Sequence, residues 1–289
     1  MSLYEMIADV PFVEPVLIAA FDGWIDASSA ATGAAAQIAE RGDVVARFDA
    51  DALFDYRARR PVLDVVDGTL AHLEWPELAL RSVEVGGRHL LVLSGPEPDY
   101  RWRQLGSDVL DLCQRVGVVQ WVSLGAIPAA VPHTRPVPVL ATASAAGLLH
   151  EDEVQGPAGL LRVPGAALST VELAVSGSGI PAVGFFAQVP HYVGGPFAPA
   201  SIALLEHLER HLSIALPLGA LVDEAQAQRD RLGAAVAADE DAAAYLQRLE
   251  TLAGDERIPS GDELASEIER FLSETGRDGG DDAGPFEGR

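Results

Sequence analysis

The chain has 289 residues, of which 48% are hydrophobic, so it is long enough to bury a large core. Its formal net charge is −23, and all 20 basic residues are arginine, because the sequence contains no lysine. So acidic a surface repels the phosphates of nucleic acids and of anionic lipids, which excludes nucleic acid and membranes as expected partners.

The features that report on cellular compartment point to the cytoplasm. Cys113 is the single cysteine, so no disulfide can form within the chain. Residues 1–15 contain acidic side chains and no basic ones, unlike a signal peptide. No apolar run approaches the roughly 18 residues that a membrane span requires. We therefore expect a cytoplasmic protein.

The first 215 residues alternate between predicted strands and helices. Residues 16–21 (VLIAAF) form a short apolar run, which predicts a fully buried strand. Residues 27–40 predict a helix with Asp26 as its N-cap, because a carboxylate can accept hydrogen bonds from the free amides of the first turn. Further strands are predicted at 43–50, 89–94, 118–126, 137–144 and from 180 onward, and further helices at 105–117, 169–179 and 200–216. This alternation predicts an α/β fold whose mostly parallel sheet carries helices on both faces.

The C-terminal part is predicted to be helical. Residues 218–253 are typical of a helical pair, and 260–276 predict another helix. Residues 277–289 contain too few apolar side chains to fold, so we expect a disordered tail. The predicted organisation is therefore an α/β core domain at 1–215, a helical segment at 216–276 packed on or near the core, and the tail.

Candidate site residues follow the predicted strands. In a parallel sheet the carboxyl ends of the strands meet at one rim, where ligand sites usually lie. Four segments are expected at that rim: 22–26, 94–97, 125–135 and 190–192. The residues in them that could bind a ligand or a partner are Asp22, Gly23, Trp24, Asp26, Thr134, Arg135, His191 and Tyr192. Ordinary polar residues also gather at loop ends, so their convergence into one pocket is a hypothesis.

The turn FDGWIDASSAA (21–31) lies between a strand and a helix, where phosphate-binding loops occur. Such loops use several glycines, whereas this turn has only Gly23 and carries the carboxylates of Asp22 and Asp26. We interpret it instead as a tight turn at Gly23 followed by a helix cap at Asp26. Trp24 is then either a lid on the core or a contact surface.

Two rim residues could take part in chemistry, but each has a structural alternative. His191 could act as a general base, although no G-x-S-x-G serine turn precedes it, and a bond to a neighbouring backbone group is the favoured interpretation. Arg135 could bind a carboxylate, but in so acidic a chain an internal ion pair is favoured.

One pair of histidines has the spacing of metal ligands. His207 and His211 lie one helical turn apart, but Leu208 stands where a zinc protease requires glutamate, so we interpret them as residues of a solvated helix face. Cys113 lies on the apolar face of its helix and is interpreted as a core residue. The sequence assigns no catalytic residue, no metal and no cofactor.

Several segments together resemble a known family. FDGWIDASSAA, HTRPVPVLATAS, GIPAVGFFAQVPHYV, LLEHLERHL and SGDELASEIERFL occur in this order. They are similar to the proteasome assembly chaperone 2 family, in the bacterial form typical of actinobacteria, over residues 13–273. The resemblance implies a three-layer α/β/α fold, similar in outline to purine nucleoside phosphorylases. It also implies a binding role, because eukaryotic relatives assist the assembly of proteasome α-subunit rings. Self-association into a homo-oligomer such as a trimer is expected as well.

The chain departs from the family pattern in two places. Archaeal relatives contact the proteasome through a C-terminal hydrophobic–Tyr–any tripeptide, whereas this sequence closes in Glu287-Gly288-Arg289. Direct insertion into proteasome pockets is therefore not expected. Ala158 stands where bacterial relatives usually have threonine, so any ligand contact of that threonine would be lost.

The sequence supports three hypotheses of function. The first is a non-enzymatic binding protein that acts in proteasome assembly or regulation, with itself and the proteasome core α-subunits as partners. The alternative is an enzyme or small-molecule binder with a nucleoside-phosphorylase-like site at the rim, built on Asp22, Asp26, Arg135 and His191. The third is a subunit of another complex whose interface is the helical segment at 216–289.

Overall fold

A computed structural model describes residues 2–8, 11–157 and 159–253. Its centre is an eight-stranded sheet with the order β1-β3-β6-β7-β2-β8-β10-β9. The strands are β1 (Tyr4–Met6), β2 (Val16–Phe21), β3 (Asp43–Phe48), β6 (Ala79–Val85), β7 (Arg88–Gly95), β8 (Gln120–Ala129), β9 (Val139–Ala143) and β10 (Ala182–Pro190). The four middle strands, β7, β2, β8 and β10, are parallel, and antiparallel strands extend the sheet on both sides. The predicted sheet is confirmed, with a parallel centre and antiparallel edges.

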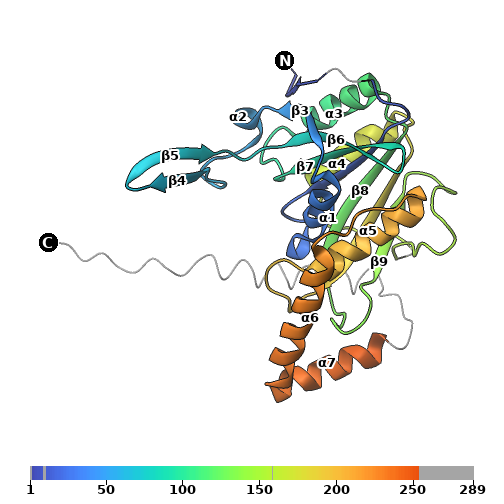
Figure 1. The fold of residues 1–289 in the computed structure, drawn as a ribbon. Coiled ribbons are helices and arrows are strands. Elements are labelled where there is room, and N and C mark those ends of the chain that lie inside the picture. Colours follow the sequence, from blue (N-terminus) through green and yellow to red (C-terminus); the bar gives the residue numbers. More distant parts are fainter. Residues whose placement is uncertain (1, 9–10, 158, 254–289) are drawn as a thin grey trace.

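Helices cover both faces of the sheet and complete a three-layer α/β/α fold (Figure 1). One face packs against α1 (Ala30–Ala39) and α5 (Ala198–Leu212), and the other against α3 (Trp102–Val116) and α4 (Ala167–Gly177). Alternate side chains of β2 enter the two cores: Val16, Ile18 and Ala20 on the α1/α5 side, and Leu17, Ala19 and Phe21 on the α3/α4 side. Because both faces of β2 are buried, its sequence is a continuous apolar run.

The predicted helical pair is confirmed as α6 (Leu221–Ala237) and α7 (Glu240–Ala253). The side-chain carbonyl of Gln228 in α6 accepts a hydrogen bond from the Ala198 amide of α5 at 2.8 Å, which holds α6 beside the start of that helix. The predicted helix at 260–276 and the tail at 277–289 lie outside the described residues, and the boundary at 215 stays a prediction. Within the described ranges, no helix is both long and apolar enough to cross a membrane.

A separate two-stranded hairpin projects from the body of the molecule (Figure 1). It consists of β4 (Val62–Val66) and β5 (Thr69–Glu74), which pair antiparallel. Asp67 and Gly68 both have positive φ, +52° and +77°, as a type I′ turn requires. The short helices η1 (Ala27–Ser29) and α2 (Ala50–Leu53) precede it along the chain. Our sequence analysis predicted no element between residues 51 and 88.

Candidate functional site

The carboxyl ends of the four parallel strands meet at one rim of the sheet. There β2 ends at Phe21, β7 at Gly95, β8 at Ala129 and β10 at Pro190. The polar residues that follow these strands form two groups. The FDGW-turn group consists of Asp22, Gly23, Trp24 and Asp26 with Arg59 and Glu97. The His–Tyr group consists of His133, Thr134, His191 and Tyr192 with Tyr245 and Glu250 of α7.

Asp22 joins three parts of the chain. Its Oδ1 accepts a hydrogen bond from the Glu97 amide at 2.9 Å, and its Oδ2 lies 2.8 Å from the Arg59 guanidinium. Gly23 has a φ of +103°, and a Cβ there would lie 3.1 Å from the Glu97 carboxylate, so the turn requires glycine. The turn therefore fixes the loop after β7 and the chain that leads into the hairpin.

Trp24 and Glu97 extend these contacts to the segment before α4. The Trp24 indole donates a hydrogen bond to the Pro164 carbonyl at 3.2 Å, and the Glu97 carboxylate accepts one from the Ala167 amide at 2.7 Å. Burial raises the pKa of Glu97, although hydrogen bonds from the backbone amides of Ala167 and Trp24 and the Arg59 charge oppose the shift. The side chains at this turn are thus occupied by internal contacts.

Asp26 caps helix α1, as predicted, although η1 intervenes before the helix begins. Its Oδ1 accepts hydrogen bonds from the Ala31 amide at 2.7 Å and the Thr32 amide at 3.2 Å, and its Oδ2 accepts one from the Thr32 hydroxyl. Burial raises the pKa of Asp26, and the bonds from Thr32 and Ala31 oppose the shift. Because the carboxylate already occupies these helix amides, they are not available to a phosphate.

The His–Tyr group packs against α7. The amide of His191 donates to the Ala129 carbonyl at 3.1 Å, its Nδ1 lies 3.3 Å from the same oxygen, and its Nε2 lies 3.3 Å from the Tyr245 hydroxyl. The Tyr192 hydroxyl accepts a hydrogen bond from the His133 amide at 2.8 Å. These contacts match the backbone-bonded interpretation of His191.

Two further rim residues contact α7 or solvent. The Thr134 hydroxyl donates to the Glu250 carboxylate of α7 at 2.5 Å. Arg135 is exposed, and we find no ion pair between it and another described residue, so the favoured internal ion pair is not seen. Among the described residues, no hydrogen bond or ion pair joins any two members of the predicted set Asp22, Asp26, Arg135 and His191. Sequence analysis missed the contribution of α7, because nothing in its pattern indicates where it docks.

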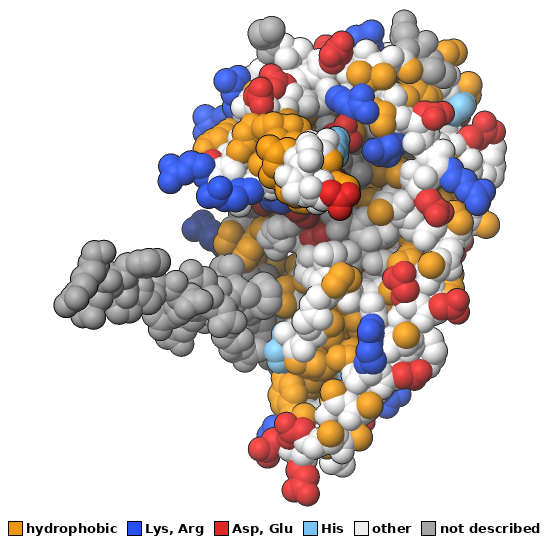
Figure 2. All heavy atoms as spheres, turned by 60° about the vertical axis from the view of Figure 1, so that its left-hand side comes forward, with side chains coloured by type: hydrophobic (Ala, Val, Ile, Leu, Met, Phe, Trp, Pro, Cys, Tyr) orange, Lys and Arg blue, Asp and Glu red, His pale blue; other side chains and the backbone are white. Residues whose placement is uncertain are grey.

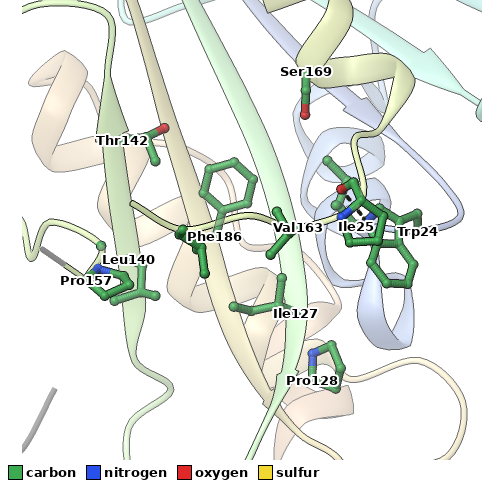
Figure 3. Close-up of a pocket in the computed structure, with 13 residues that line it drawn as sticks. Trp24, Ile25, Ile127, Pro128, Leu140, Thr142, Pro157, Val163, Ser169 and Phe186 are labelled. Atoms are coloured by element: carbon green, nitrogen blue, oxygen red, sulfur yellow. Dashed lines mark hydrogen bonds between the residues drawn. The ribbon is translucent and has the colours of Figure 1, made fainter. Parts of the chain in front are cut away.

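An apolar pocket lies beside the FDGW turn, on the α3/α4 face of β8, β10 and β9 (Figure 3). Its volume is about 230 Å³. Its lining is mainly hydrophobic and includes Trp24, Ile127, Leu140, Val163 and Phe186, with the hydroxyls of Thr142 and Ser169 as polar side-chain groups. Such a lining suits an apolar group rather than a phosphate or a charged substrate.

Phe186 lies against two glycines of the sheet. A Cβ on Gly125 would lie 2.4 Å from the Phe186 ring, and a Cβ on Gly184 would lie 2.8 Å from it. The ring therefore occupies the space that side chains would fill at these positions, and it contributes to the pocket (Figure 3). Sequence analysis missed this pocket, although a glycine inside a predicted strand is a signal of close approach by another group.

Three residues outside the rim test the other interpretations made from the sequence: Cys113, His207 and His211. Cys113 is fully buried, and burial raises the pKa of its thiol to about 12, which confirms it as a core residue. His211 does not belong to a solvated face, because only 4% of its side chain is exposed and it pairs with Glu153. That interpretation is wrong because the loop that contains Glu153 folds over the end of α5. His207 is half-buried, with its Nδ1 2.8 Å from the Ala203 carbonyl.

Comparison with known proteins identifies relatives that cover most of the chain. The PAC2 family model matches residues 20–236. A solved Mycobacterium tuberculosis protein of unknown function is 32% identical, covers 94% of this chain and 96% of its own, and has a TM-score of 0.82. A Mycobacterium tuberculosis proteasome-assembly chaperone homologue is 36% identical, with coverages of 80% and 99% and a TM-score of 0.73. A PAC2 family protein from Streptomyces avermitilis is 35% identical, with coverages of 80% and 99% and a TM-score of 0.72. Among curated proteins, none matches this chain.

Proposed function

Because the chain belongs to the PAC2 family, we propose that it is a non-enzymatic binding protein that acts in proteasome assembly or regulation through protein–protein contacts. The similar Mycobacterium tuberculosis protein is a proteasome-assembly chaperone homologue, which supports this assignment. The occupied polar residues of the rim support it as well, since they hold the fold together instead of facing a common substrate position.

The exposure of the β4–β5 hairpin is the observation that best supports a role in protein–protein contacts. Every residue of both strands is exposed. The exposed side chains include a large apolar set: Val62, Leu63, Val65, Val66, Leu70 and Leu73. Figure 2, in which this side of the molecule comes forward, shows hydrophobic side chains gathered there with arginines nearby. An exposed apolar patch of this kind marks a protein-interaction surface.

A second copy of this chain is the partner that best fits the hairpin. An isolated two-stranded hairpin is only marginally stable in water, so this one needs a covering surface to persist. Arg57, Arg59 and Arg60 lie in the segment that leads into it, whereas the chain as a whole carries a net charge of −23. Because Asp64, Asp67 and Glu74 balance these three arginines, the segment 57–74 has no formal net charge, so the acidic body of another copy does not repel this apolar arm. We infer that the hairpin mediates homo-oligomerisation, for example into a trimer.

The first test measures the mass of the full-length protein in solution by light scattering after size exclusion. Replacing Val65 and Leu70 by serine removes two side chains that each contribute about 1.5–3 kcal/mol when fully buried. Association should weaken by about 10²- to 10⁴-fold, which yields a monomer at micromolar concentration. The control is Leu173→Ser, at a side chain of α4 that is 74% exposed, and its mass should not change. A monomeric wild type, or a double variant with unchanged mass, would exclude this role of the hairpin.

The second test addresses the proteasome directly. The wild type and the hairpin variant are each mixed with proteasome α-subunits and with assembled core particles of the host, and complexes are separated by native electrophoresis. Binding by the wild type is expected. No binding to either preparation would refute the proteasome role even if self-association is found, so the two parts of the proposal fail separately.

The apolar pocket favours a second candidate function, a small-molecule binder at the rim. Its position at the carboxyl ends of the strands is that of ligand sites in α/β folds. A panel of nucleosides and apolar carboxylates is tested by the shift in melting temperature of the wild type and of Phe186→Ala. A saturable shift that the variant loses would support this function, and no shift for any compound would exclude the nucleoside-phosphorylase-like site.

A further inference from the structure

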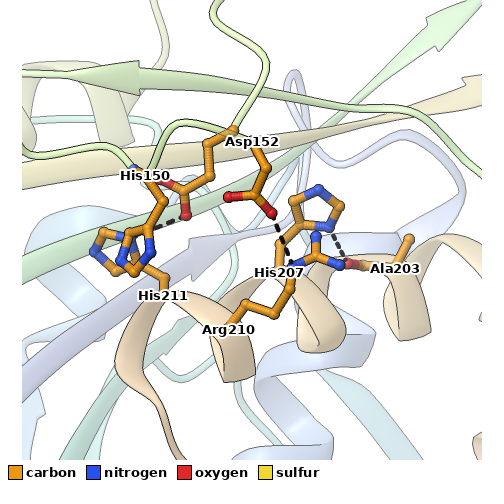
Figure 4. A network of polar contacts seen from close by, with 7 residues as sticks. His150, Asp152, Ala203, His207, Arg210 and His211 are labelled. Atoms are coloured by element: carbon orange, nitrogen blue, oxygen red, sulfur yellow. Dashed lines mark hydrogen bonds and ion pairs between the residues drawn. The ribbon is translucent and has the colours of Figure 1, made fainter.

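A cluster of metal-ligating side chains (Figure 4) lies beside Gln120, the first residue of β8, and so at the end of the sheet opposite the rim. It combines His211 from the last turn of α5 with His150 and Glu153 from the loop after β9. One potential ligand atom from each of the three residues lies within 4.8 Å of the other two. We propose that His150, Glu153 and His211 bind a divalent transition metal ion of the Zn²⁺ type. This proposal is independent of the proposed function.

The geometry requires only a small contraction to bind zinc. Zn–N and Zn–O bonds of about 2.0–2.1 Å in tetrahedral geometry place the ligand atoms about 3.4 Å apart. The His211 Nδ1 and the Glu153 Oε1 are 3.1 Å apart, close to this separation. His150 is exposed on a loop, so its ring can rotate to supply the third ligand without disturbing the core. The fourth position would be filled by water.

Neighbouring residues hold the His211 and Glu153 side chains in place, as is usual for metal ligands. Only 4% of the His211 side chain and 2% of the Glu153 side chain are exposed. The Phe185 ring packs edge-on against the His211 ring, with centroids 5.3 Å apart, and the His150 amide donates to the Glu153 Oε2 at 2.7 Å. These contacts fix the direction of both ligands before a metal arrives, which lowers the entropic cost of binding.

Gln120 provides the outer partner that a ligating histidine requires. Its side-chain amide lies 2.8 Å from the His211 Nε2. In the metal-free protein, the His211 Nδ1–H donates to Glu153 and the Nε2 accepts from the Gln120 amide nitrogen. On binding, the ring changes tautomer: the proton leaves Nδ1 and a proton from solvent occupies Nε2, so that the Nδ1 lone pair faces the metal and the ring stays neutral. The Gln120 amide then turns, so that its oxygen accepts the Nε2–H and fixes the tautomer.

The local electrostatic field also favours a cation. His211 lies in the last turn of α5, where the helix carbonyls carry partial negative charge. Glu151 and Asp152 of the same loop are exposed and add negative charge, although Arg210 lies 4.0 Å from Asp152 and offsets part of it. A bound metal would clamp the 150–153 loop to the core. Since this loop leads into the segment that covers the apolar pocket, the metal would also stabilise that cover.

The test uses the full-length protein after chelator treatment. Zn²⁺ is titrated by calorimetry, and Co²⁺ is added separately, because its visible absorption reports tetrahedral coordination. We expect one equivalent of Zn²⁺ to bind, with a rise in melting temperature. His150→Ala changes only an exposed ligand, so it should fold normally and lose most of the affinity. Gln120→Ala should weaken binding by about 10- to 100-fold.

His207→Gln is the matched control, because His207 lies on the same helix and is not a proposed ligand. Its affinity for Zn²⁺ should equal that of the wild type. Unchanged binding in both His150→Ala and Glu153→Gln would overturn the site, as would the absence of saturable binding in the wild type. Loss of binding in the control alone would assign the metal to His207 instead.

Discussion

Replacing Asp26 by alanine removes the buried cap of α1, and its cost can be worked from the structure. Asp26 is 7% exposed, and its carboxylate accepts hydrogen bonds from the Ala31 amide, the Thr32 amide and the Thr32 hydroxyl. Loss of an N-cap costs about 0.5–2 kcal/mol, and a buried donor left without a partner costs about 1–3 kcal/mol. Ala31 is fully buried, whereas water can reach the half-buried Thr32.

The net effect on the free energy of unfolding should be a loss of about 2–3 kcal/mol, because relief from burying a carboxylate offsets part of the cost. For a domain of this size, the melting temperature should fall by about 4–12 °C. Urea unfolding measures both the midpoint and the slope, and the slope should not change. Asp49→Ala is the matched control, since Asp49 caps α2 through the Ala52 amide at 3.2 Å but is exposed. It should cost at most about 1 kcal/mol.

The pH dependence supplies a second readout of Asp26. Burial raises the pKa of its carboxyl above the ordinary value of 3.8, so the folded state holds this proton more tightly than the unfolded chain does. The contribution of Asp26 to stability is therefore largest at acidic pH and declines as pH rises from 3.8 through the folded-state pKa. The deficit of Asp26→Ala relative to the wild type should grow on acidification across this window. A variant within about 0.5 kcal/mol of the wild type would refute the capping argument.

Two further predictions concern the core. Gly125→Ala places a Cβ 2.4 Å from the Phe186 ring, so it should cost about 1–3 kcal/mol in urea unfolding, and combining it with Phe186→Ala should cost less than the sum of the two. Additive costs would contradict the contact. Cys113 is 0% exposed with a pKa raised to about 12, so a thiol reagent at neutral pH should label it at least 10³-fold more slowly in the folded protein than in urea. Comparable labelling rates would show that its helix opens readily.

The elements predicted well were those whose burial leaves a clear pattern. The run VLIAAF is apolar throughout because both faces of β2 are covered, and Asp26 precedes its helix with the chemistry of a cap. The antiparallel direction of the outer strands was not predicted, because strand patterns do not record direction. The β4–β5 hairpin was missed although Asp67-Gly68 is a strong turn signal between two apolar runs.

The rim of the sheet could be predicted from the sequence, whereas the contacts among its side chains could not, and its role as a binding site stays a prediction. The parallel strands end at one rim as topology requires, but which side chains touch is decided by segments far away in the chain. Arg59 reaches Asp22 from the approach to the hairpin, and Tyr245 reaches His191 from α7. Long-range contacts of this kind have no signature in the spacing of either partner. The pairing of His211 with Glu153 has the same origin, since it depends on how a loop folds over a helix end.

The position of β2 in the sheet affects how the chain folds while it is still being synthesised on the ribosome. β2 is made early, yet its two neighbours are β7, which begins at Arg88, and β8, which begins at Gln120. At about 5–20 residues per second, its backbone groups remain without their native neighbours for on the order of ten seconds. During that time a strand without a single charged side chain is open to non-native pairing. Nascent-chain holdases should therefore act on this protein before residue 130 has emerged.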